Sequence, residues 1–432
     1  MPQQIPGLAL NEIHEMMLND SFKGIPGDVE PFPLREIGKR RWNVLREDLP
    51  LPLMVLKQSA VRQNSEIMQR YLQQHDLFLA PHGKTHMAPQ LFDLQIAAGA
   101  WAITAATVSQ IQVYRRFGVQ RILMANQLFG RQNIRYIVEE TNVHPEFEFY
   151  CLVDSPEGVR YLAKMLREFQ IARPIRVLLE AGFQGGRTGF RGVESAREVI
   201  GELRACPDVL AIAGVEGFEG IISLDQREGG DSRVDGLLHF IQSILGELTV
   251  EDFSRVHEVI LSAGGSAYFD RVAQIFQKVE FGLPKRIVIR SGCYLTHDSE
   301  MYEAFQERRV IRGWDNGKFR PALEIWSYVQ SLPEPGLAIL TMGKRDCAYD
   351  YLLPRPEKTY RRGAGERALP ACQITALNDQ HAYMNYPRGT DLRVGDMIAS
   401  GISHPCTAFD KWKFIPVVDD HYDVVDGIVT FF

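Results

Sequence analysis

The feature that most constrains the fold is an alternation of short apolar runs with amphipathic helical patterns, which begins near Leu77. Runs of this kind, separated by helices long enough to cross back over a sheet, are typical of βα units with parallel strands. The expected strands are Leu77–Ala80, Ala102–Thr104, Arg121–Met124, Glu146–Val153, Ile175–Glu180, Ala211–Gly217, Glu258–Ser262 and Arg286–Arg290. The expected helices include Pro89–Gly99, Val108–Phe117, Pro156–Phe169, Ala196–Ala205, Arg233–Leu248 and Ala267–Val279. About eight repeats over roughly 210 residues favour a closed (β/α)8 barrel over an open doubly wound sheet.

The pattern changes after about Met301, where helical periodicity fades and apolar stretches alternate with turns rich in proline and glycine. The stretches are Leu323–Val329, Leu337–Thr341, Cys372–Leu377, Met397–Gly401 and Ile415–Val418. They predict a second, β-rich domain. The polar segment Leu353–Leu369 is expected to be a long surface loop. We therefore predict an N-terminal extension that packs on the β domain (1–50), a barrel (51–305) and a C-terminal β domain (306–432).

Composition narrows the classes of function. The 432 residues are 45% hydrophobic and 24% charged, close to the averages for globular proteins. The net charge is −6 and no long block of like charge is present, so nucleic acid is not an expected partner. No secretory signal or membrane-length apolar run is evident, and we expect a cytoplasmic protein. Six scattered cysteines predict reduced thiols, so any special cysteine must be a ligand or nucleophile.

A lysine follows the first expected barrel strand, in the run Leu77-Phe-Leu-Ala-Pro-His-Gly-Lys-Thr-His86. The C-terminal ends of barrel strands face the active site, so Lys84, His82 and His86 are expected to point into the mouth. A lysine there can form a Schiff base if burial or nearby positive charge lowers its pKa. The alternative is an exposed, solvated lysine at a strand end.

Two loops after the last expected barrel strands are candidates for anion binding, because phosphate sites of barrels often lie there. In Ser262-Ala-Gly-Gly-Ser266 the glycines permit close approach of the backbone, and Ser266 can cap a helix that starts near Ala267. The run Arg290-Ser-Gly-Cys-Tyr294 should lie beside it. The alternative is a tight turn with an ordinary helix cap.

Two further motifs are ambiguous by themselves. The glycine-rich run Glu180–Gly189 presents Arg187 after the fifth strand, but it could be a turn with a solvated arginine. In His404-Pro-Cys406 an extended backbone would project imidazole and thiolate to the same side, where both could bind one zinc ion and leave coordination positions open. The alternative is a turn with a buried cysteine. Asn378–His381 adds polar candidates, which could equally form a solvated turn.

Taken together and in this order, the motifs resemble those of fold-type III pyridoxal-phosphate (PLP) enzymes, in the branch of D-serine dehydratases (D-amino acid deaminases) and D-threonine aldolases. The resemblance runs from about Pro52 to the C-terminus. It is carried by PHGKTHMAP, LLEAGFQGGRTG, SAGGS, VIRSGCYLTHD, MGKRDCAYDYLLPRP, ALNDQHA and GISHPCTAFDKW. It implies an alanine-racemase-like PLP-binding barrel with a C-terminal β domain, and a homodimer.

The resemblance also implies roles for individual residues. Lys84 would hold PLP covalently and, once displaced by a D-amino acid, would remove its α-proton. The other implied cofactor-binding residues are His82, Arg187, Gly264, Gly265, Ser266, Ser291, Gly292 and Tyr294. The implied ligands of zinc, or of another divalent metal, are His404 and Cys406, and the implied substrate contacts are Gln380 and His381.

The activity implied is dehydration of D-serine or a related D-3-hydroxy amino acid to a 2-keto acid and ammonia. The pattern His-x-Cys is similar to that of the dehydratases, whereas bacterial D-threonine aldolases tend to carry His-x-Asp. A Lewis acid suits dehydration because hydroxide is a poor leaving group. The alternatives are retro-aldol cleavage to glycine and an aldehyde, and a non-catalytic PLP carrier, a class that lacks a β domain with a metal motif.

Overall fold

The computed structural model describes residues 7–222, 230–256, 258–311, 313–369 and 371–432. Contacts divide the chain into two compact units. The first comprises residues 70–84 and 95–292 with Gly7, and the second comprises residues 8–69, 85–94 and 293–432. Each unit is therefore assembled from separate stretches, whereas the sequence predicted boundaries only at residues 51 and 305.

Within the described residues, the first unit holds eight parallel strands in the order β4-β11-β10-β9-β8-β7-β6-β5. They are β4 (Phe78–Leu79), β5 (Ile103–Ala105), β6 (Arg121–Gln127), β7 (Glu148–Val153), β8 (Ile175–Ala181), β9 (Leu210–Gly217), β10 (Val259–Ala263) and β11 (Lys285–Ile289). The sheet curls until its end strands meet, because Trp101 N–H donates to Leu79 O at 2.7 Å and His82 bridges to Thr104. The expected (β/α)8 barrel is confirmed, and each strand overlaps its predicted range.

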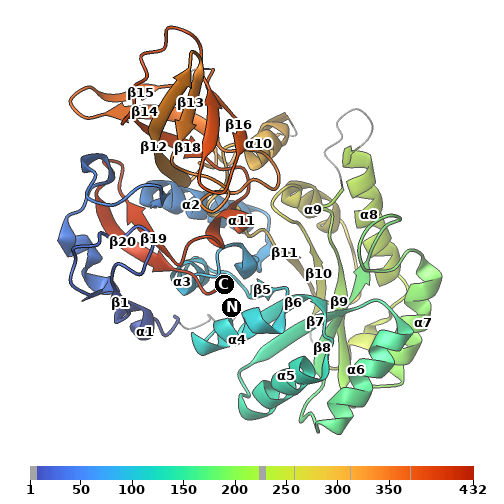
Figure 1. Ribbon diagram of the computed structural model, residues 1–432. Helices are drawn as coiled ribbons and strands as arrows, with labels where there is room; N and C mark the ends of the chain where they lie inside the picture. Colours follow the sequence, from blue (N-terminus) through green and yellow to red (C-terminus); the bar gives the residue numbers. More distant parts are fainter. Residues whose placement is uncertain (1–6, 223–229, 257, 312, 370) are drawn as a thin grey trace. The chain divides into compact units, whose positions relative to one another are not determined.

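Helices cover the outer side of this sheet (Figure 1). They are α4 (Val108–Arg116), α5 (Arg131–Val143), α6 (Pro156–Glu168), α7 (Val193–Arg204), α8 (Gly230–Leu245) and α9 (Phe269–Phe276), with a 3₁₀ turn η4 (Val250–Phe253). Helix α6 illustrates their origin: Ser155 accepts a hydrogen bond from Gly158 N–H as N-cap, and Pro156 occupies the first turn. Strand β9 is buried along its whole length, as expected when both faces of a parallel sheet are covered.

The second unit is β-rich, as predicted. Its antiparallel path is β15-β14-β18-β12-β13-β17-β16, while β3 pairs with β12 and β19, and β20 pairs with β19. The strands are β1 (Met17–Leu18), β2 (Phe32–Pro33), β3 (Leu53–Lys57), β12 (Leu323–Glu334), β13 (Leu337–Leu340), β14 (Arg355–Arg361), β15 (Gly365–Ala368), β16 (Gln373–Leu377), β17 (Ala382–Asn385), β18 (Met397–Gly401), β19 (Phe414–Val418) and β20 (Val424–Val429). The helical elements are α1 (Asn11–His14), η1 (Leu34–Arg40), η2 (Val44–Arg46), α10 (Met301–Ile311) and α11 (Pro405–Phe409). Helices α2 (Gln58–Gln74) and α3 (Pro89–Ala97) pass from one unit to the other.

The N-terminal segment contributes directly to the second unit. Strand β3 lies between β12, which it pairs antiparallel, and β19, which it pairs parallel. Upstream of it, Asn43 bridges to Asp423, and Val44 N–H donates to Tyr422 O at 3.1 Å. Strand β3 is therefore part of the β-rich sheet and not part of the barrel.

The surface loop predicted at Leu353–Leu369 is wrong, because most of this segment forms the hairpin of β14 and β15. The turn between them contains Gly363 and β15 begins at Gly365, and these glycines have φ angles of +81° and +77°. Strand β14 also pairs with β18, but only Pro356 and Thr359 among its side chains are buried. The sequence is polar because the hairpin lies at the edge of the sheet, where most side chains meet solvent.

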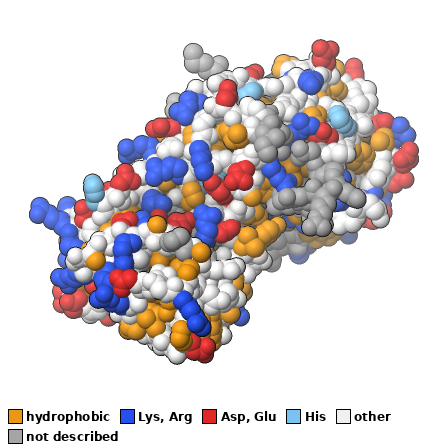
Figure 2. All heavy atoms as spheres, turned by 90° about the horizontal axis from the view of Figure 1, so that it is seen from above, with side chains coloured by type: hydrophobic (Ala, Val, Ile, Leu, Met, Phe, Trp, Pro, Cys, Tyr) orange, Lys and Arg blue, Asp and Glu red, His pale blue; other side chains and the backbone are white. Residues whose placement is uncertain are grey.

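No helix among the described residues is long and apolar enough to cross a bilayer. On the face drawn in Figure 2, acidic and basic side chains are both present over the surface.

Candidate functional site

Lys84 lies just beyond the end of β4, in the 3₁₀ turn η3 (Gly83–Thr85). The turn starts where His82 bridges to Thr104 of the next strand, which fixes the backbone on the N-terminal side of the lysine. The Lys84 side chain is half-buried, and no ion pair of Lys84 is found within the described part of the chain. Its amine is therefore at a strand end without a neutralising carboxylate.

Three cations lie near the His82 ring. Burial, then the positive charges of Lys84 and Arg290, and also that of Arg187, keep the pKa of His82 well below its ordinary value. His82 Nδ1 is buried without a hydrogen-bond partner among the described residues. The mouth of the barrel thus carries a neutral imidazole next to three cations, of which Arg290 is paired with Glu216.

Arg187 projects from the glycine-rich loop that follows β8. Its guanidinium lies over the Phe218 ring, 4.8 Å from the centroid, while the side chain stays exposed. The same loop is tied down by Thr188, whose hydroxyl donates to Glu180 at 2.7 Å, and by Gly189, whose N–H donates to Asp154 at 2.9 Å. Arg187 is exposed, as the alternative of a solvated arginine predicts. Its positive charge nevertheless contributes to lowering the pKa of His82.

The two glycines expected to bind phosphate do present their amides to an anion. Gly264 N–H and Gly265 N–H donate to the two carboxylate oxygens of Glu219, at 3.0 and 2.7 Å. Gly264 has a φ of +89°, a conformation that favours glycine. Sequence reasoning missed Glu219, because nothing in its local pattern indicates which amides it meets.

The loops after β10 and β11 lie side by side, as predicted. The Ser291 hydroxyl donates a hydrogen bond to Ser266 Oγ at 3.0 Å, and the backbone N–H of Arg290 donates to Gly264 O at 3.0 Å. The expectation that Ser266 caps the next helix is wrong, because α9 begins at Phe269 and Tyr268 occupies the N-cap position. Gly292 ends the first unit directly after this pair of loops.

Arg290, which directly precedes Ser291, takes part in a buried ion pair. Arg290 pairs with Glu216 and also donates to Ser262 Oγ and to Gly217 O, at 3.0 and 2.9 Å. Burial outweighs the arginine and raises the pKa of Glu216 to about 7, and burial also raises the pKa of Glu219. Neither glutamate was assigned from sequence.

In the second unit His404 and Cys406 are brought together, but not as predicted. His404 is the N-cap residue of α11 and Pro405 lies in its first turn, so the motif is not an extended segment. His404 Nδ1 lies 2.7 Å from Asp350 Oδ2, and Thr407 donates to the other oxygen of Asp350 at 2.5 Å. A carboxylate on one ring nitrogen orients a histidine so that the other nitrogen can bind a metal.

The charges around this pair favour a thiolate. Hydrogen bonding to Cys293, and then the His404 ring, hold the pKa of Cys406 well below its ordinary value despite burial. Burial lowers the pKa of His404, but Cys406 and Asp350 outweigh it and raise that pKa to about 9. A cysteine thiolate and a histidine form a donor set typical of zinc sites, once the metal has displaced the proton of the histidine ring.

Four other predicted site residues belong to the second unit. Tyr294 is buried within the second unit. His86 also belongs to that unit, where its ring packs on Phe92 and Phe409 with centroids 4.9 and 5.9 Å away. Gln380 and His381 lie in the turn between β16 and β17, where Gln380 donates to Asp346 at 3.3 Å.

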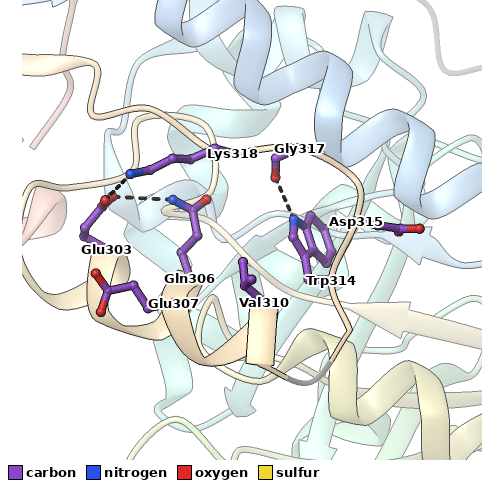
Figure 3. Close-up of a pocket in the computed structure, with 8 residues that line it drawn as sticks. All are labelled: Glu303, Gln306, Glu307, Val310, Trp314, Asp315, Gly317 and Lys318. Atoms are coloured by element: carbon purple, nitrogen blue, oxygen red, sulfur yellow. Dashed lines mark hydrogen bonds and ion pairs between the residues drawn. The ribbon is translucent and has the colours of Figure 1, made fainter.

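A surface cavity of about 340 Å³ lies along α10 and the segment after it (Figure 3). Glu303 on its wall pairs with Lys318 at 2.5 Å, and Trp314 Nε1 donates to Gly317 O at 2.6 Å. None of the predicted site residues lines this cavity.

Comparison with known proteins identifies the relatives of this chain. Residues 322–418 match the model of a putative serine dehydratase domain. D-threonine aldolase from Arthrobacter sp. is 23% identical over 85% of this chain and 89% of its own length. The structure of D-threonine aldolase from Filomicrobium marinum, 21% identical, superposes with a TM-score of 0.70 over 89% of this chain and 95% of that one.

The chain is related in sequence to D-threonine aldolase and shares its fold. The resemblance drawn from the sequence motifs is thereby confirmed at this level. D-threo-3-hydroxyaspartate dehydratase from Delftia sp. HT23 shares the fold of this chain, with 17% identity, a TM-score of 0.68 and coverage of 90% and 99% of the two chains. A structure of a dehydratase of that name, with a cysteine replaced by alanine, is described as a metal-free form.

Proposed function

We propose that the chain is a lyase dependent on PLP and a divalent metal, and that it dehydrates D-serine or a related D-3-hydroxy amino acid to a 2-keto acid and ammonia. The observation that carries the proposal is the pair of donors His404 and Cys406, with the histidine oriented by Asp350. The matched serine dehydratase domain spans all three residues. One structural neighbour is a cysteine-to-alanine variant of D-threo-3-hydroxyaspartate dehydratase in a metal-free form, and this description supports a metal in enzymes of this kind.

The first unit fits PLP. The amides of Gly264 and Gly265 already hold a carboxylate, so they can hold a phosphate once Glu219 gives way. The paired hydroxyls of Ser266 and Ser291 lie in the loops beside them. The buried, unpartnered His82 Nδ1 and the cations around that ring suit the remaining polar atoms of an anionic cofactor.

The second unit fits a divalent metal through the chemistry of its donors. A thiolate and an imidazole select zinc over magnesium or calcium, which prefer oxygen ligands. Within the described residues, no three His, Cys, Asp or Glu side chains are already arranged around one point. We therefore assign His404 and Cys406 as ligands and leave the other positions open, as metal-assisted chemistry requires.

Individual residues of the chain have separate roles in the proposed reaction. PLP supplies, when bound, a sink for the charge that develops at the substrate α-carbon. Lys84 holds the cofactor and, once displaced, accepts the α-proton as general base. Because its pKa is depressed, His82 stays neutral and leaves the positive charge at the mouth to Lys84, Arg187 and Arg290. The metal held by His404 and Cys406 would polarise the β-hydroxyl as it leaves.

Retro-aldol cleavage to glycine and an aldehyde is the second candidate, because proteins named D-threonine aldolase are among the relatives in sequence and in structure. Both reactions act on a substrate with a β-hydroxyl group, so the products decide between them. Purified protein supplied with PLP and zinc should be incubated with D-serine, D-threonine and D-3-hydroxyaspartate. Ammonia and a keto acid are expected, and release of glycine with an aldehyde would replace dehydration by the alternative.

Substitutions test the PLP site and the metal site separately. Lys84→Ala should abolish both the visible absorbance of lysine-bound PLP and turnover, whereas Lys164→Ala, at an exposed position of α6, should change neither. Cys406→Ala should keep the absorbance and lose turnover, whereas Cys372→Ala should keep both. Unchanged absorbance in Lys84→Ala would contradict the assignment of the lysine.

A further inference from the structure

A second cysteine lies against the proposed metal ligand. Cys293 Sγ is 3.7 Å from Cys406 Sγ, and both sulfurs contact the Thr85 hydroxyl, at 3.8 and 3.6 Å. All three residues belong to the second unit, so the cluster is defined within one compact body. Cys293 is 4% exposed and follows the loop of Ser291 and Gly292, yet the sequence assigned it no role.

The distance between the sulfurs suits a hydrogen bond between them, and it equally suits two ligands of one metal. Zinc binds thiolates at about 2.3 Å with tetrahedral angles, which places two bound sulfurs about 3.8 Å apart. A disulfide would require about 2.05 Å, so the two thiols are not bonded to each other. The observed 3.7 Å is thus a separation at which two sulfurs can bind one zinc ion.

The third donor is on the other side of Cys406. The His404 ring is within hydrogen-bonding reach of Cys406, while its Nδ1 is held by Asp350 at 2.7 Å. Cys406 is therefore central, with Cys293 and His404 both against it. Since the three side chains do not yet surround one point, binding must draw the outer two donors in by side-chain rotation.

We infer that Cys293 is a third protein ligand of the metal, which makes the site a two-cysteine, one-histidine site with one open position. This inference rests on the proposed metal site at His404 and Cys406. Two cysteines and one histidine with an open fourth position form a known catalytic zinc set. Two thiolates neutralise the charge of a divalent ion, so the metal would be held tightly in a buried place. The open position is left for the substrate's β-hydroxyl.

X-ray absorption of the wild-type protein, loaded with zinc after chelator treatment, tests the inference without any substitution. Two sulfurs at about 2.3 Å and one nitrogen at about 2.0 Å are expected. A single sulfur with the nitrogen would overturn the inference and leave the proposed function standing. Protein that binds no zinc would overturn both the third ligand and the metal-dependent function.

A matched pair of variants gives a second readout. Cys293→Ser should lose one sulfur from the spectrum and weaken zinc binding at least about tenfold, since loss of an outer-shell partner alone costs about 10–100-fold. Cys347→Ser is the control, because Cys347 is also buried in the second unit but donates to Gly343 O at 3.2 Å. It should leave both values unchanged. Equal zinc affinity in Cys293→Ser and wild type would overturn the inference.

Discussion

At the scale of single residues, Gly264 shows how little freedom the anion-binding turn has. Its φ is +89°, and a Cβ there would lie 3.1 Å from Ile289 Cγ2. Gly264→Ala should therefore lower the free energy of unfolding by about 1–2 kcal/mol, because an L-residue is strained in this region and the new methyl must displace Ile289. It should also weaken PLP binding, because the amide that faces Glu219 moves. Thermal unfolding and a PLP titration followed by absorbance measure the two effects.

Gly201 in α7 supplies the control of opposite sign. It is exposed and has no neighbouring atom within 4 Å of an added Cβ. Gly201→Ala should therefore raise the stability by about 0.5–1 kcal/mol through helix propensity, with no change in PLP binding. If Gly264→Ala were as stable as wild type, the turn would not depend on glycine at that position.

The residues of the site that could be predicted from sequence are those in contiguous motifs. Ser291 was placed beside the glycine turn because both motifs follow neighbouring barrel strands. Partners far apart in sequence could not be predicted: Glu219 and Gly264 are 45 positions apart, His404 and Asp350 are 54 apart, and Cys293 and Cys406 are 113 apart. Such pairs depend on tertiary packing, which local patterns do not encode.

At the scale of elements, burial decided which strands could be predicted. The barrel strands are covered on both faces and appear as continuous apolar runs, such as β9. Strands β14 and β15 lie at a sheet edge with polar side chains, so their segment resembled a loop. Strand β3 is apolar, but its partners β12 and β19 follow more than 250 positions later, so no local pattern could assign it to the β-rich sheet.

A buried carboxylate secures β3 to its partner. Glu324 of β12 accepts from Lys57 of β3 and from the Tyr422 hydroxyl, each at 2.7 Å. Burial acts to raise the pKa of Glu324, but the charges of Lys57 and Lys358 outweigh it and lower that pKa. Glu324→Gln should destabilise the protein by about 2–3 kcal/mol at pH 7, because it leaves a partly buried lysine without its counter-charge. Denaturant unfolding measures the difference.

This difference should depend on pH in a defined direction. Because the folded pKa is lowered, the stabilisation by Glu324 is present above the unfolded pKa of about 4.3 and is lost as pH falls through the folded value. The gap between wild type and Glu324→Gln should therefore shrink in acid. Glu334→Gln, at the exposed end of the same strand, should show little effect at either pH. A gap that stayed constant down to strongly acidic pH would contradict the role of the carboxylate charge.

At the scale of the whole molecule, the two units share one interleaved chain. Residues 8–69 and 85–94 complete the second unit, whose remainder is residues 293–432. The segment 293–432 expressed alone should not unfold cooperatively, because removal of β3 leaves the hydrogen-bonding edges of β12 and β19 open. Near-ultraviolet circular dichroism during thermal unfolding measures this. A sharp transition in the isolated segment would show that β3 is dispensable.

Because the second unit combines segments far apart in sequence, its strands leave the ribosome at different times. A chain emerging from the ribosome releases β3 early, but the first residue of β12 that pairs with it, Leu323, is added 267 positions after Leu56. All the barrel strands are complete by Ile289, so the barrel can form while the apolar β3 still waits for its neighbours. During that interval an exposed strand is open to pairing with other nascent chains, and chaperone binding to residues 53–57 would protect the growing polypeptide.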